Sequence, residues 1–370
     1  MQHSKVDIMS IDRVIVLESK DQWVKLSPNW NKLLEASTSE SVFLTWEWLF
    51  AWTHFCLGEN RKLYAVLFYK NEQLIGIAPF YIHVLKKGPF TIRELRFLGT
   101  PEAGSDYLDV FADKGMEKEV ANGLYNFLMG PAAKVWDQMA LRDMPANSLF
   151  LLHFTRRIEK EGKYFELRQN AYCPIAHLEA SVEKHFEQIS PKRMQKIRQK
   201  SNKLNRHGSV IHDVFIRDIP EHAIADFFKY YEEKAGWSSE YVRPIIEKVV
   251  KHQNEVLNIQ FDFLRVDGQV VTGLVFLRYK DTLSQYLMFT DKNFLPNASV
   301  GIILIVKCLE NAVNTGIKAY DFLKGIEEYK FHWSNAGIST MQLNFWQKKP
   351  SAIYSAYTNL VRHAGKLILR

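Results

Sequence analysis

A chain of 370 residues is long enough to bury two separate hydrophobic cores. Its 47% hydrophobic and 24% charged residues are typical of a globular protein, which excludes an intrinsically disordered chain. The formal net charge of +7 favours anionic ligands, such as CoA phosphates, nucleotide-linked sugars, RNA or a membrane surface, without choosing among them.

The cysteines and the N-terminus indicate the cellular compartment of the protein. Cys56, Cys173 and Cys308 are too few and too scattered for a disulfide framework or a zinc site. We therefore expect buried thiols, a reducing compartment and no metal. The N-terminus has no basic-then-apolar signal sequence, and no apolar run approaches the length of a membrane span. These features predict a cytoplasmic protein.

The first forty residues predict a short strand at 14–17 and a helix at 28–36. Residues 43–55 are aromatic at helical spacing, with Thr45 as the expected N-cap. Trp48, Trp52 and Phe55 share one side of this helix. Such a stripe belongs more often to a core than to a binding surface, so we expect core packing.

The chain then repeats one pattern of elements. A β-hairpin, in which two apolar runs flank a short polar turn, is predicted once in each half of the chain. Each hairpin is followed later by a helix and then a strand. The predicted segments are 63–69 with 74–82, 116–129 and 135–141 in the first half, and 261–266 with 270–278, 300–315 and 317–323 in the second. The repeat predicts two similar mixed α/β domains, at residues 1–180 and 181–370.

A polar loop in the first half, Gly99 to Asp109, contains two glycines and three carboxylates. It is either a structural turn or a substrate-recognition loop. On the second interpretation, Asp106 and Tyr107 are substrate-binding candidates.

The most basic segment is a predicted helix that begins at Ser190-Pro191 and ends at Gly208. Its only apolar stripe is Met194, Ile197, Ser201 and Leu204, and no acidic residue lies between Pro191 and Gly208. The helix is therefore either a solvated face or an anion-binding site. In the second case Arg193 and Lys196 are the binding candidates.

Two further segments have open interpretations. Trp237 follows the predicted helix 223–234 and is either a wall of the substrate pocket or a core tryptophan. Residues 351–370 predict a basic amphipathic helix, for which packing on the second domain and peripheral membrane contact are the alternatives.

The stretch that carries most ionisable groups is residues 317–333. The apolar run 317–323 predicts a buried strand, and Gly325 then allows the backbone to turn. Two carboxylates, a phenol, an ammonium, an imidazole and an indole follow at once. Ionisable groups at the end of a buried strand are typical of the sites where α/β proteins carry out chemistry.

The residues Asp321-Phe322, Gly325, Tyr329-Lys330 and Trp333 resemble the Asp-Phe-x-x-Gly-x-x-x-Tyr-Lys-x-x-Trp signature of the CelD/BcsL-like (cellulose biosynthesis) acetyltransferases of the GNAT superfamily. The resemblance extends over most of the chain and includes 43–49, 77–80, 96–99 with 105–109, and the basic helix. It implies an α/β fold of two tandem GNAT-like N-acyltransferase domains, as in the related FemAB-type transferases. It also implies a first domain on the acceptor side, without a cofactor.

The resemblance further implies that acetyl-CoA or another acyl-CoA places its pyrophosphate on the backbone at a helix start. The fitting segment is Ser299, Val300, Gly301 and Ile302, although Gly301 is the only glycine of the usual two-glycine fingerprint. This departure leaves the acyl carrier open among CoA, a carrier protein and tRNA.

For the chemistry, Glu327 or Glu328 is the candidate base and Tyr329 the candidate proton donor to the leaving thiolate. Lys330 is the candidate for stabilising the oxyanion or a phosphate, and Asp321 is expected to cap or orient. The predicted function is an acyl-CoA-dependent N- or O-acyltransferase acting on a saccharide or surface-polymer precursor. The alternatives are aminoacyl transfer from charged tRNA, with the basic helix as the RNA contact, and a non-catalytic tandem GNAT binding module.

Overall fold

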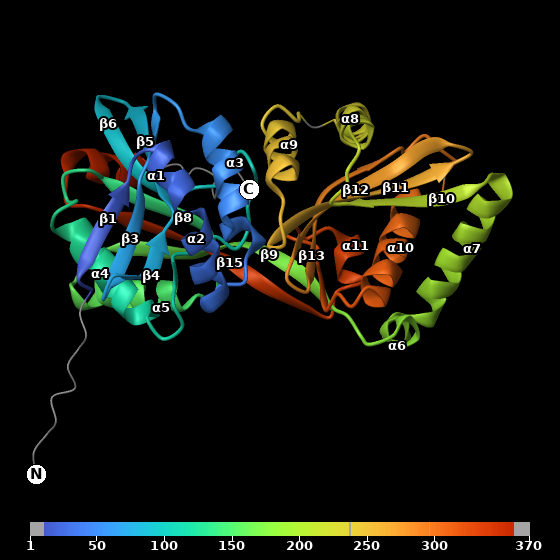
Figure 1. The fold of residues 1–370 in the computed structure, drawn as a ribbon, viewed down its shortest axis with the longest axis horizontal. Helices are drawn as coiled ribbons and strands as arrows, with labels where there is room; N and C mark the ends of the chain where they lie inside the picture. The colour runs from blue at the N-terminus through green and yellow to red at the C-terminus, as the bar shows by residue number, and fades with distance from the viewer. Residues whose placement is uncertain (1–10, 237, 296, 359–370) are drawn as a thin grey trace, which may run out of the picture. The chain divides into compact units, whose positions relative to one another are not determined.

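The structure is a computed structural model that describes residues 11–236, 238–295 and 297–358. These residues form two compact units, shown in Figure 1. The first contains residues up to 170 and from 340 onward, and the second contains residues 171–339. These bounds differ from 1–180 and 181–370 because the chain returns to the first unit after residue 339. The acceptor and cofactor roles of the two predicted domains stay predictions.

The first unit combines the elements of the N-terminal half with a strand from near the C-terminus. They are β1 (Arg13–Leu17), α1 (Lys20–Lys25), α2 (Ser27–Ala36), η1 (Val42–Leu44), α3 (Trp46–Cys56), β2 (Arg61–Leu63), β3 (Ala65–Lys70), β4 (Gln73–Ala78), β5 (Phe80–Lys87), β6 (Phe90–Phe97), β7 (Phe111–Ala112), α4 (Glu117–Met129), β8 (Gln138–Pro145) and α5 (Leu149–Lys160). Strands β9 (Phe165–His177) and β15 (Ala336–Trp346) cross the bounds between the units.

Two sets of strands organise this unit. One sheet has the order β1-β3-β4-β7, and the strands β15-β8-β6-β5-β2 are neighbours in a second sheet. The predicted hairpin is β3–β4, where Asn71 and Glu72 have the positive φ angles of a tight two-residue turn. The aromatic helix α3 is confirmed, with Trp48 and Trp52 fully buried. Phe55 is 38% exposed, and the Thr45 hydroxyl donates to Val42 instead of capping a helix N–H.

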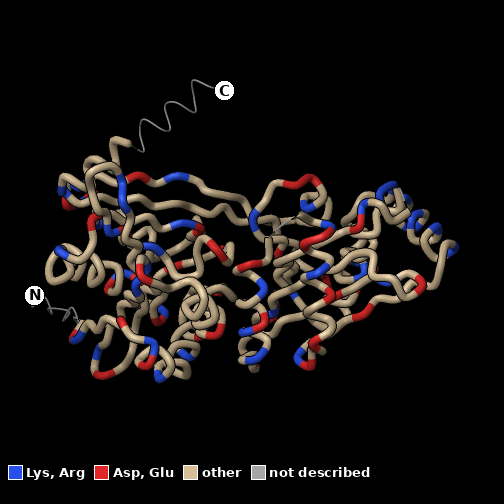
Figure 2. The backbone as a smooth tube through the Cα atoms, turned by 90° about the horizontal axis from the view of Figure 1, so that it is seen from above, with Lys and Arg blue, Asp and Glu red and all other residues tan. Residues whose placement is uncertain are grey.

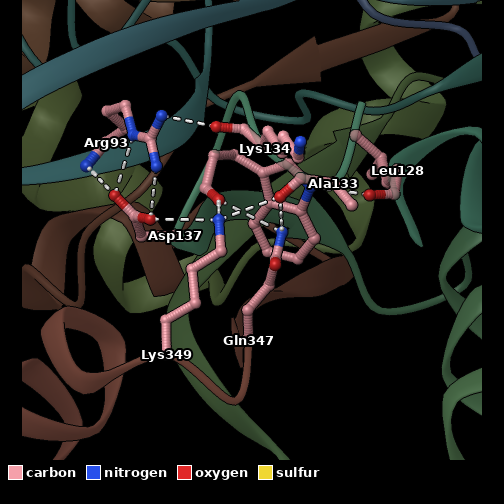
Figure 3. Close-up of polar contacts among 8 residues, drawn as sticks. Arg93, Leu128, Ala133, Lys134, Asp137, Gln347 and Lys349 are labelled. Atoms are coloured by element: carbon pink, nitrogen blue, oxygen red, sulfur yellow. Dashed lines mark hydrogen bonds and ion pairs between the residues drawn. The ribbon is translucent and has the colours of Figure 1, made fainter. Parts of the chain in front are cut away.

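Within the first unit, an ion-pair network joins the residues after β15 to β6 and to the start of β8 (Figure 3). The Asp137 carboxylate accepts from the Arg93 guanidinium, at 2.8 and 3.0 Å, and from the Lys349 ammonium at 3.2 Å. Lys349 also donates to the carbonyl of Trp136 at 2.6 Å, and Gln347 donates to the same carbonyl. Burial would raise the pKa of Asp137, but the hydrogen bonds from Arg93 and Lys349 lower it.

The second unit contains the remaining helices and strands. They are α6 (Val182–Glu187), α7 (Pro191–His207), β10 (Val210–Ile216), α8 (Glu221–Tyr230) with the π-helical turn η2 (Tyr231–Ala235), α9 (Val242–His252), β11 (Leu257–Val266), β12 (Gln269–Tyr279), β13 (Thr282–Thr290), α10 (Val300–Asn314), β14 (Ala319–Asp321) and α11 (Glu328–Phe331).

A mixed sheet with the order β10-β11-β12-β13-β14-β9 forms the centre of the second unit. Helix α10 covers one face, where Leu304 and Leu309 pack in a cluster with Leu274 and Phe276 of β12. Helix α8 covers the other face through Phe227, which contacts Phe261 of β11. The predicted mixed α/β class is therefore confirmed. Within the described ranges, no helix combines the length and the apolar character needed to cross a membrane.

Candidate active site

The strands β13 and β14 separate from each other and leave a fork in the sheet. They pair in parallel only where Ala319–Asp321 lie against residues 282–284. Beyond Ser284, β13 continues to Thr290 and pairs with β12 alone. Beyond Ser284, this edge of β13 therefore presents backbone groups that have no partner strand among the described strands.

Three polar side chains meet at the base of the fork. The Tyr320 hydroxyl donates to Gln285 Oε1 at 2.8 Å, and Gln285 Nε2 donates to the Tyr329 hydroxyl at 3.2 Å. Tyr320 and Gln285 are buried, whereas Tyr329 is half-buried. Sequence reasoning missed Gln285, although a glutamine within the mostly apolar run of β13 was a usable signal. Because Tyr329 accepts from Gln285, its own proton is free to donate to a bound group.

The pKa of Tyr329 limits what this hydroxyl does. Burial and the nearby Glu327 carboxylate raise the pKa of Tyr329 to about 12. An ordinary thiol has a pKa of about 8.5. Full proton transfer from this phenol to a thiolate would therefore be uphill. Donation of a hydrogen bond to developing negative charge is the role that these values favour.

Lys330 is buried, and its ammonium already has partners. It donates to the carbonyl oxygens of Lys324 at 2.8 Å and Leu323 at 3.4 Å, and it lies 3.1 Å from the Glu327 carboxylate. An ammonium has three donors, so these contacts use all of them. Lys330 is only 4% exposed. Its first role in this geometry is to hold the turn at Gly325, whose φ is +138°.

The two glutamates occupy different positions. The Glu327 side chain is 57% exposed and reaches back to Lys330. The Glu328 side chain is 92% exposed, and its carboxylate lies 3.5 Å from His332 Nε2. Asp321 is buried, and its carboxylate accepts the backbone N–H of Leu323 at 2.8 Å. The residues expected to act together are thus divided: Tyr329 and Lys330 point inward, and Glu328 does not.

The predicted phosphate site is the N-terminus of α10. Ser299 is the N-cap residue in the left-handed conformation, and its side chain makes no capping hydrogen bond. Instead its hydroxyl accepts from the Lys200 ammonium of α7 at 2.5 Å. Among the described residues, no hydrogen-bond acceptor is found for the backbone N–H groups of Val300 and Gly301. Free N–H groups, the positive end of a fifteen-residue helix and an ammonium favour an anion here.

Strained backbone precedes this helix start. Leu295, Asn297 and Ser299 all have positive φ angles, and such conformations collect at ligand sites. Gly301 and Ile302 follow in the first turn. A Cβ on Gly301 would lie 2.6 Å from Met288 Cε and 2.7 Å from Thr290 Oγ1, so the glycine lets α10 approach β13. The helix start therefore lies beside the far end of the fork.

Most of the basic residues of α7 are exposed. Figure 2 marks the positions of lysine and arginine along the backbone. Ile197 and Leu204 are buried against α10 and the neighbouring strands, and Met194 and Ser201 are half-buried, so the predicted apolar stripe is confirmed. Lys196 is exposed and Arg193 is half-buried. Of the basic residues on α7, Lys200 is the one with a hydrogen bond to the α10 N-cap.

The remaining predicted binding residues lie elsewhere. Asp106 is 1% exposed and Tyr107 is half-buried, in a first-unit loop anchored where Trp48 donates to Ser105 at 2.9 Å. Their burial favours the structural interpretation of that loop, and their role as substrate ligands stays a prediction. Trp237 lies outside the described residues.

A second cluster of chemistry-bearing side chains lies beneath α10. Its members are His212, Asp262 and Cys308, whose ligand atoms all fall within 4.8 Å of one another. The buried Asp262 carboxylate contacts His212 Nε2 at 2.6 Å and accepts from the Cys308 thiol at 3.5 Å and from Gln260 at 2.6 Å. Burial, followed by Asp262, raises the pKa of Cys308 well above its usual value. These hydrogen bonds account for the buried carboxylate without a metal ion.

Comparison with known proteins identifies a domain family and the fold. Residues 191–331 match the family model described as "Acetyltransferase (GNAT) domain". No curated protein matches. Among solved structures, FemX is similar with a TM-score of 0.57 and 10% identity, over 89% of this chain and 96% of FemX.

Two further structures have the same fold. L-PGS from Bacillus licheniformis gives a TM-score of 0.52 at 11% identity, over 92% of this chain and 96% of that one. A tandem GNAT protein from the clavulanic acid biosynthesis pathway gives 0.51 at 9% identity, over 90% and 97%. The fold is therefore the GNAT fold, as predicted, and the second unit carries the domain of a GNAT-type acyltransferase. The protein is an enzyme of the acyltransferase class.

Proposed function

We propose that the protein is an acyl-CoA-dependent N- or O-acyltransferase that modifies a saccharide or a surface-polymer precursor. The observation that carries the proposal is the shape of the fork in the second unit. Its base presents the Tyr329 hydroxyl, and its far end lies beside the start of α10, where the N–H groups of Val300 and Gly301 have no acceptor among the described residues. The four residue-to-residue steps of β13 from Gln285 to Phe289 span about 14 Å between the two ends.

An extended acyl-CoA suits this arrangement. The pyrophosphate binds the free N–H groups of Val300 and Gly301 and the Lys200 ammonium, and the pantetheine arm lies along the unpaired edge of β13. The backbone groups of that edge then pair with the amides of the arm. The thioester reaches the base of the fork, where Tyr329 donates to the sulfur or to the carbonyl oxygen.

Acyl transfer then needs one proton to be removed and one charge to be stabilised. An amine or hydroxyl of the acceptor attacks the thioester carbon, its proton passes to a base, and the tetrahedral intermediate expels the CoA thiolate. Glu327 is the proposed base, because Glu328 points to solvent. Lys330 supports the turn and contributes a fixed positive charge, and Asp321 holds the preceding backbone.

The class of acceptor rests on the resemblance to the CelD/BcsL-like acetyltransferases, which supports a polysaccharide precursor. The acyl-CoA donor and three free, buried cysteines support a cytoplasmic location.

A second candidate function is aminoacyl transfer from charged tRNA. The exposed cations of α7 favour it, because a row of unpaired positive charges suits a nucleic-acid backbone. Against it, α7 carries no Phe, Tyr or Trp on which a base could stack.

Titration of the full chain with acetyl-CoA and, separately, with uncharged tRNA tests the two functions. We expect acetyl-CoA to bind and to release free thiol when an amino-sugar oligosaccharide is added. The double variant Arg193→Glu and Lys196→Glu should leave acetyl-CoA binding unchanged. If acetyl-CoA does not bind, while tRNA binds with a steep salt dependence that this variant abolishes, the proposed function is wrong and the tRNA function is favoured. Binding of acetyl-CoA without thiol release for any acceptor would favour the non-catalytic module.

A further inference from the structure

The first unit has a sheet face that is polar and nevertheless buried. Along β6, β8 and β15, core residues such as Leu95, Met139 and Leu343 alternate with polar residues on the opposite face. The polar residues include Glu94, Gln138, Gln342 and Asn344, which are each 3–7% exposed. Burying polar groups is costly unless they are paired, so such a face points to a purpose other than packing.

This face borders a cavity of about 520 Å³ in which these strands and β9 supply the walls. The cavity lies where β6 and β8 separate, because these parallel strands pair only at Glu94–Gln138 and Leu95–Met139. Among its lining residues are Arg96, Arg142, Glu166, Arg168 and Trp346. A polar cavity of this size is large enough for a ligand of one or two sugar rings.

Most of the buried polar atoms are tied into two chains of hydrogen bonds. In one, Arg96 and Gln138 both donate to the Glu94 carboxylate. In the other, Arg168 donates to Gln342, Gln342 donates to Asn344 at 2.9 Å, and Asn344 donates to Glu166 at 2.7 Å. These bonds fix the side chains in place before any ligand binds.

Gln138 and Arg142 are among the lining residues that have a polar group without a partner in the described ranges. Gln138 is 4% exposed, and its Oε1 has no hydrogen bond within the part of the chain that the structure describes. The Gln138 Nε2 group donates to the Glu94 carboxylate. Because a carboxylate only accepts hydrogen bonds, the amide must turn its nitrogen toward Glu94, and this orientation leaves Oε1 without a donor. Arg142 is exposed, and no hydrogen bond or ion pair connects its guanidinium to a described residue. A buried free acceptor and a free guanidinium therefore both border the cavity.

The chemistry of the lining selects one class of ligand. Free carbonyl and carboxylate oxygens accept hydroxyl protons, and a guanidinium binds carboxylate or phosphate with two parallel bonds. The five cations among the lining residues, Lys86, Lys87, Arg96, Arg142 and Arg168, outnumber Glu94 and Glu166. Trp346, stacked on Tyr164 with ring centroids 5.8 Å apart, adds an aromatic wall against which the apolar face of a sugar ring can pack.

We propose that this cavity binds an anionic saccharide, a sugar that carries a carboxylate or a phosphate. In this site Gln138 Oε1 and the Glu94 carboxylate accept sugar hydroxyls, Arg142 binds the anionic group, and Trp346 packs on the ring. The role of this cavity as the acceptor site rests on the proposed function. Its binding of a saccharide is argued from the residues of the first unit alone.

The test is a ligand-observed NMR titration of the full chain, without any acyl donor, against glucose 1-phosphate, glucuronate and glucose. We expect both anionic sugars to bind in the millimolar range or tighter, and glucose to bind more weakly. Which of the two anionic sugars binds more tightly shows whether the site prefers a phosphate or a carboxylate. Arg142→Met should weaken both at least tenfold, because it removes a charge-assisted pair, and should leave glucose binding unchanged. Arg156→Met, an exposed arginine of α5, is the matched control and should change nothing.

Gln138→Met should weaken the binding of all three sugars, since it removes an acceptor for a sugar hydroxyl. If this buried substitution unfolds the protein, the exposed Arg142→Met variant still tests the proposal. The proposal is overturned if no sugar binds in the millimolar range, or if Arg142→Met binds the anionic sugars as tightly as the unmodified protein. Because the titration omits acyl-CoA, its failure would leave the acyltransferase proposal intact. Failure of acyl-CoA binding would likewise leave the saccharide site standing.

Discussion

Lys200 provides the most direct test of the donor site. Its ammonium donates to the Ser299 hydroxyl at the start of α10, and no carboxylate partner is found for it among the described residues. A phosphate bound at the helix start would supply the missing counter-charge. A hydrogen bond to a charged group contributes about 1.5–3 kcal/mol. At about 1.4 kcal/mol per decade, Lys200→Met should raise the Kd for acetyl-CoA by roughly 10- to 150-fold.

The measurement is isothermal titration of the full chain with acetyl-CoA and with acetyl-pantetheine, which lacks the nucleotide and its phosphates. Lys200→Met should weaken acetyl-CoA binding and leave acetyl-pantetheine binding unchanged. Lys203→Met, on an exposed position of the same helix, controls for the loss of one positive charge on α7. Methionine keeps most of the apolar stem of the half-buried lysine, so the melting temperature should change little. Equal losses for both donors, or an unchanged Kd for acetyl-CoA, would refute the phosphate site at α10.

Three further outcomes are expected. Tyr329→Phe removes the donor at the base of the fork and should lower kcat by roughly 100-fold or more with little change in KM, as steady-state kinetics will show. Glu327→Gln should lower turnover by about two to four decades. Glu328→Gln should not, and a loss in both or in neither would contradict the assignment. Burial raises the pKa of Asp109 from 3.8 to about 7. Because the folded pKa exceeds the unfolded one, the stabilisation present below pH 4 is lost as the pH rises through 7, by about 4 kcal/mol. Asp109→Asn should therefore flatten the dependence of the urea midpoint on pH, and an unchanged slope would show that Asp109 is already ionised.

Much of the fold could be predicted from periodicity. The hairpins β3–β4 and β11–β12, the helices α4 and α10 and the basic helix α7 all follow from local patterns of apolar and turn residues. The unit bounds depend on a strand that pairs far along the chain. Residues 340–346 lie beside β8 of the first unit, and no local signal in β15 indicates that partner.

In the candidate site, too, local features could be predicted from the sequence, and contacts between distant segments could not. The inward direction of Lys330 follows from its place after the Gly325 turn. Glu327 and Glu328 are adjacent at the start of the short helix α11. Composition alone does not predict which of the two side chains reaches Lys330 and which faces solvent. Gln285 and Lys200 come from β13 and α7, so only the folded chain brings them to the site. Gly301 is also a packing residue, which makes a bulky substitution there unsuitable as a selective probe of ligand binding.

The return of the chain to the first unit also constrains folding during synthesis. A ribosome releases residues 1–170 well before residues 340–349, so β8 leaves the exit tunnel without its β15 neighbour, and Asp137 without Lys349. Until then the edge of β8 is open to pairing with other chains. The usual order, in which the N-terminal domain is completed first, is therefore reversed here. We expect a fragment that ends at residue 170 to aggregate, and co-expression of a segment containing β15 to restore its solubility.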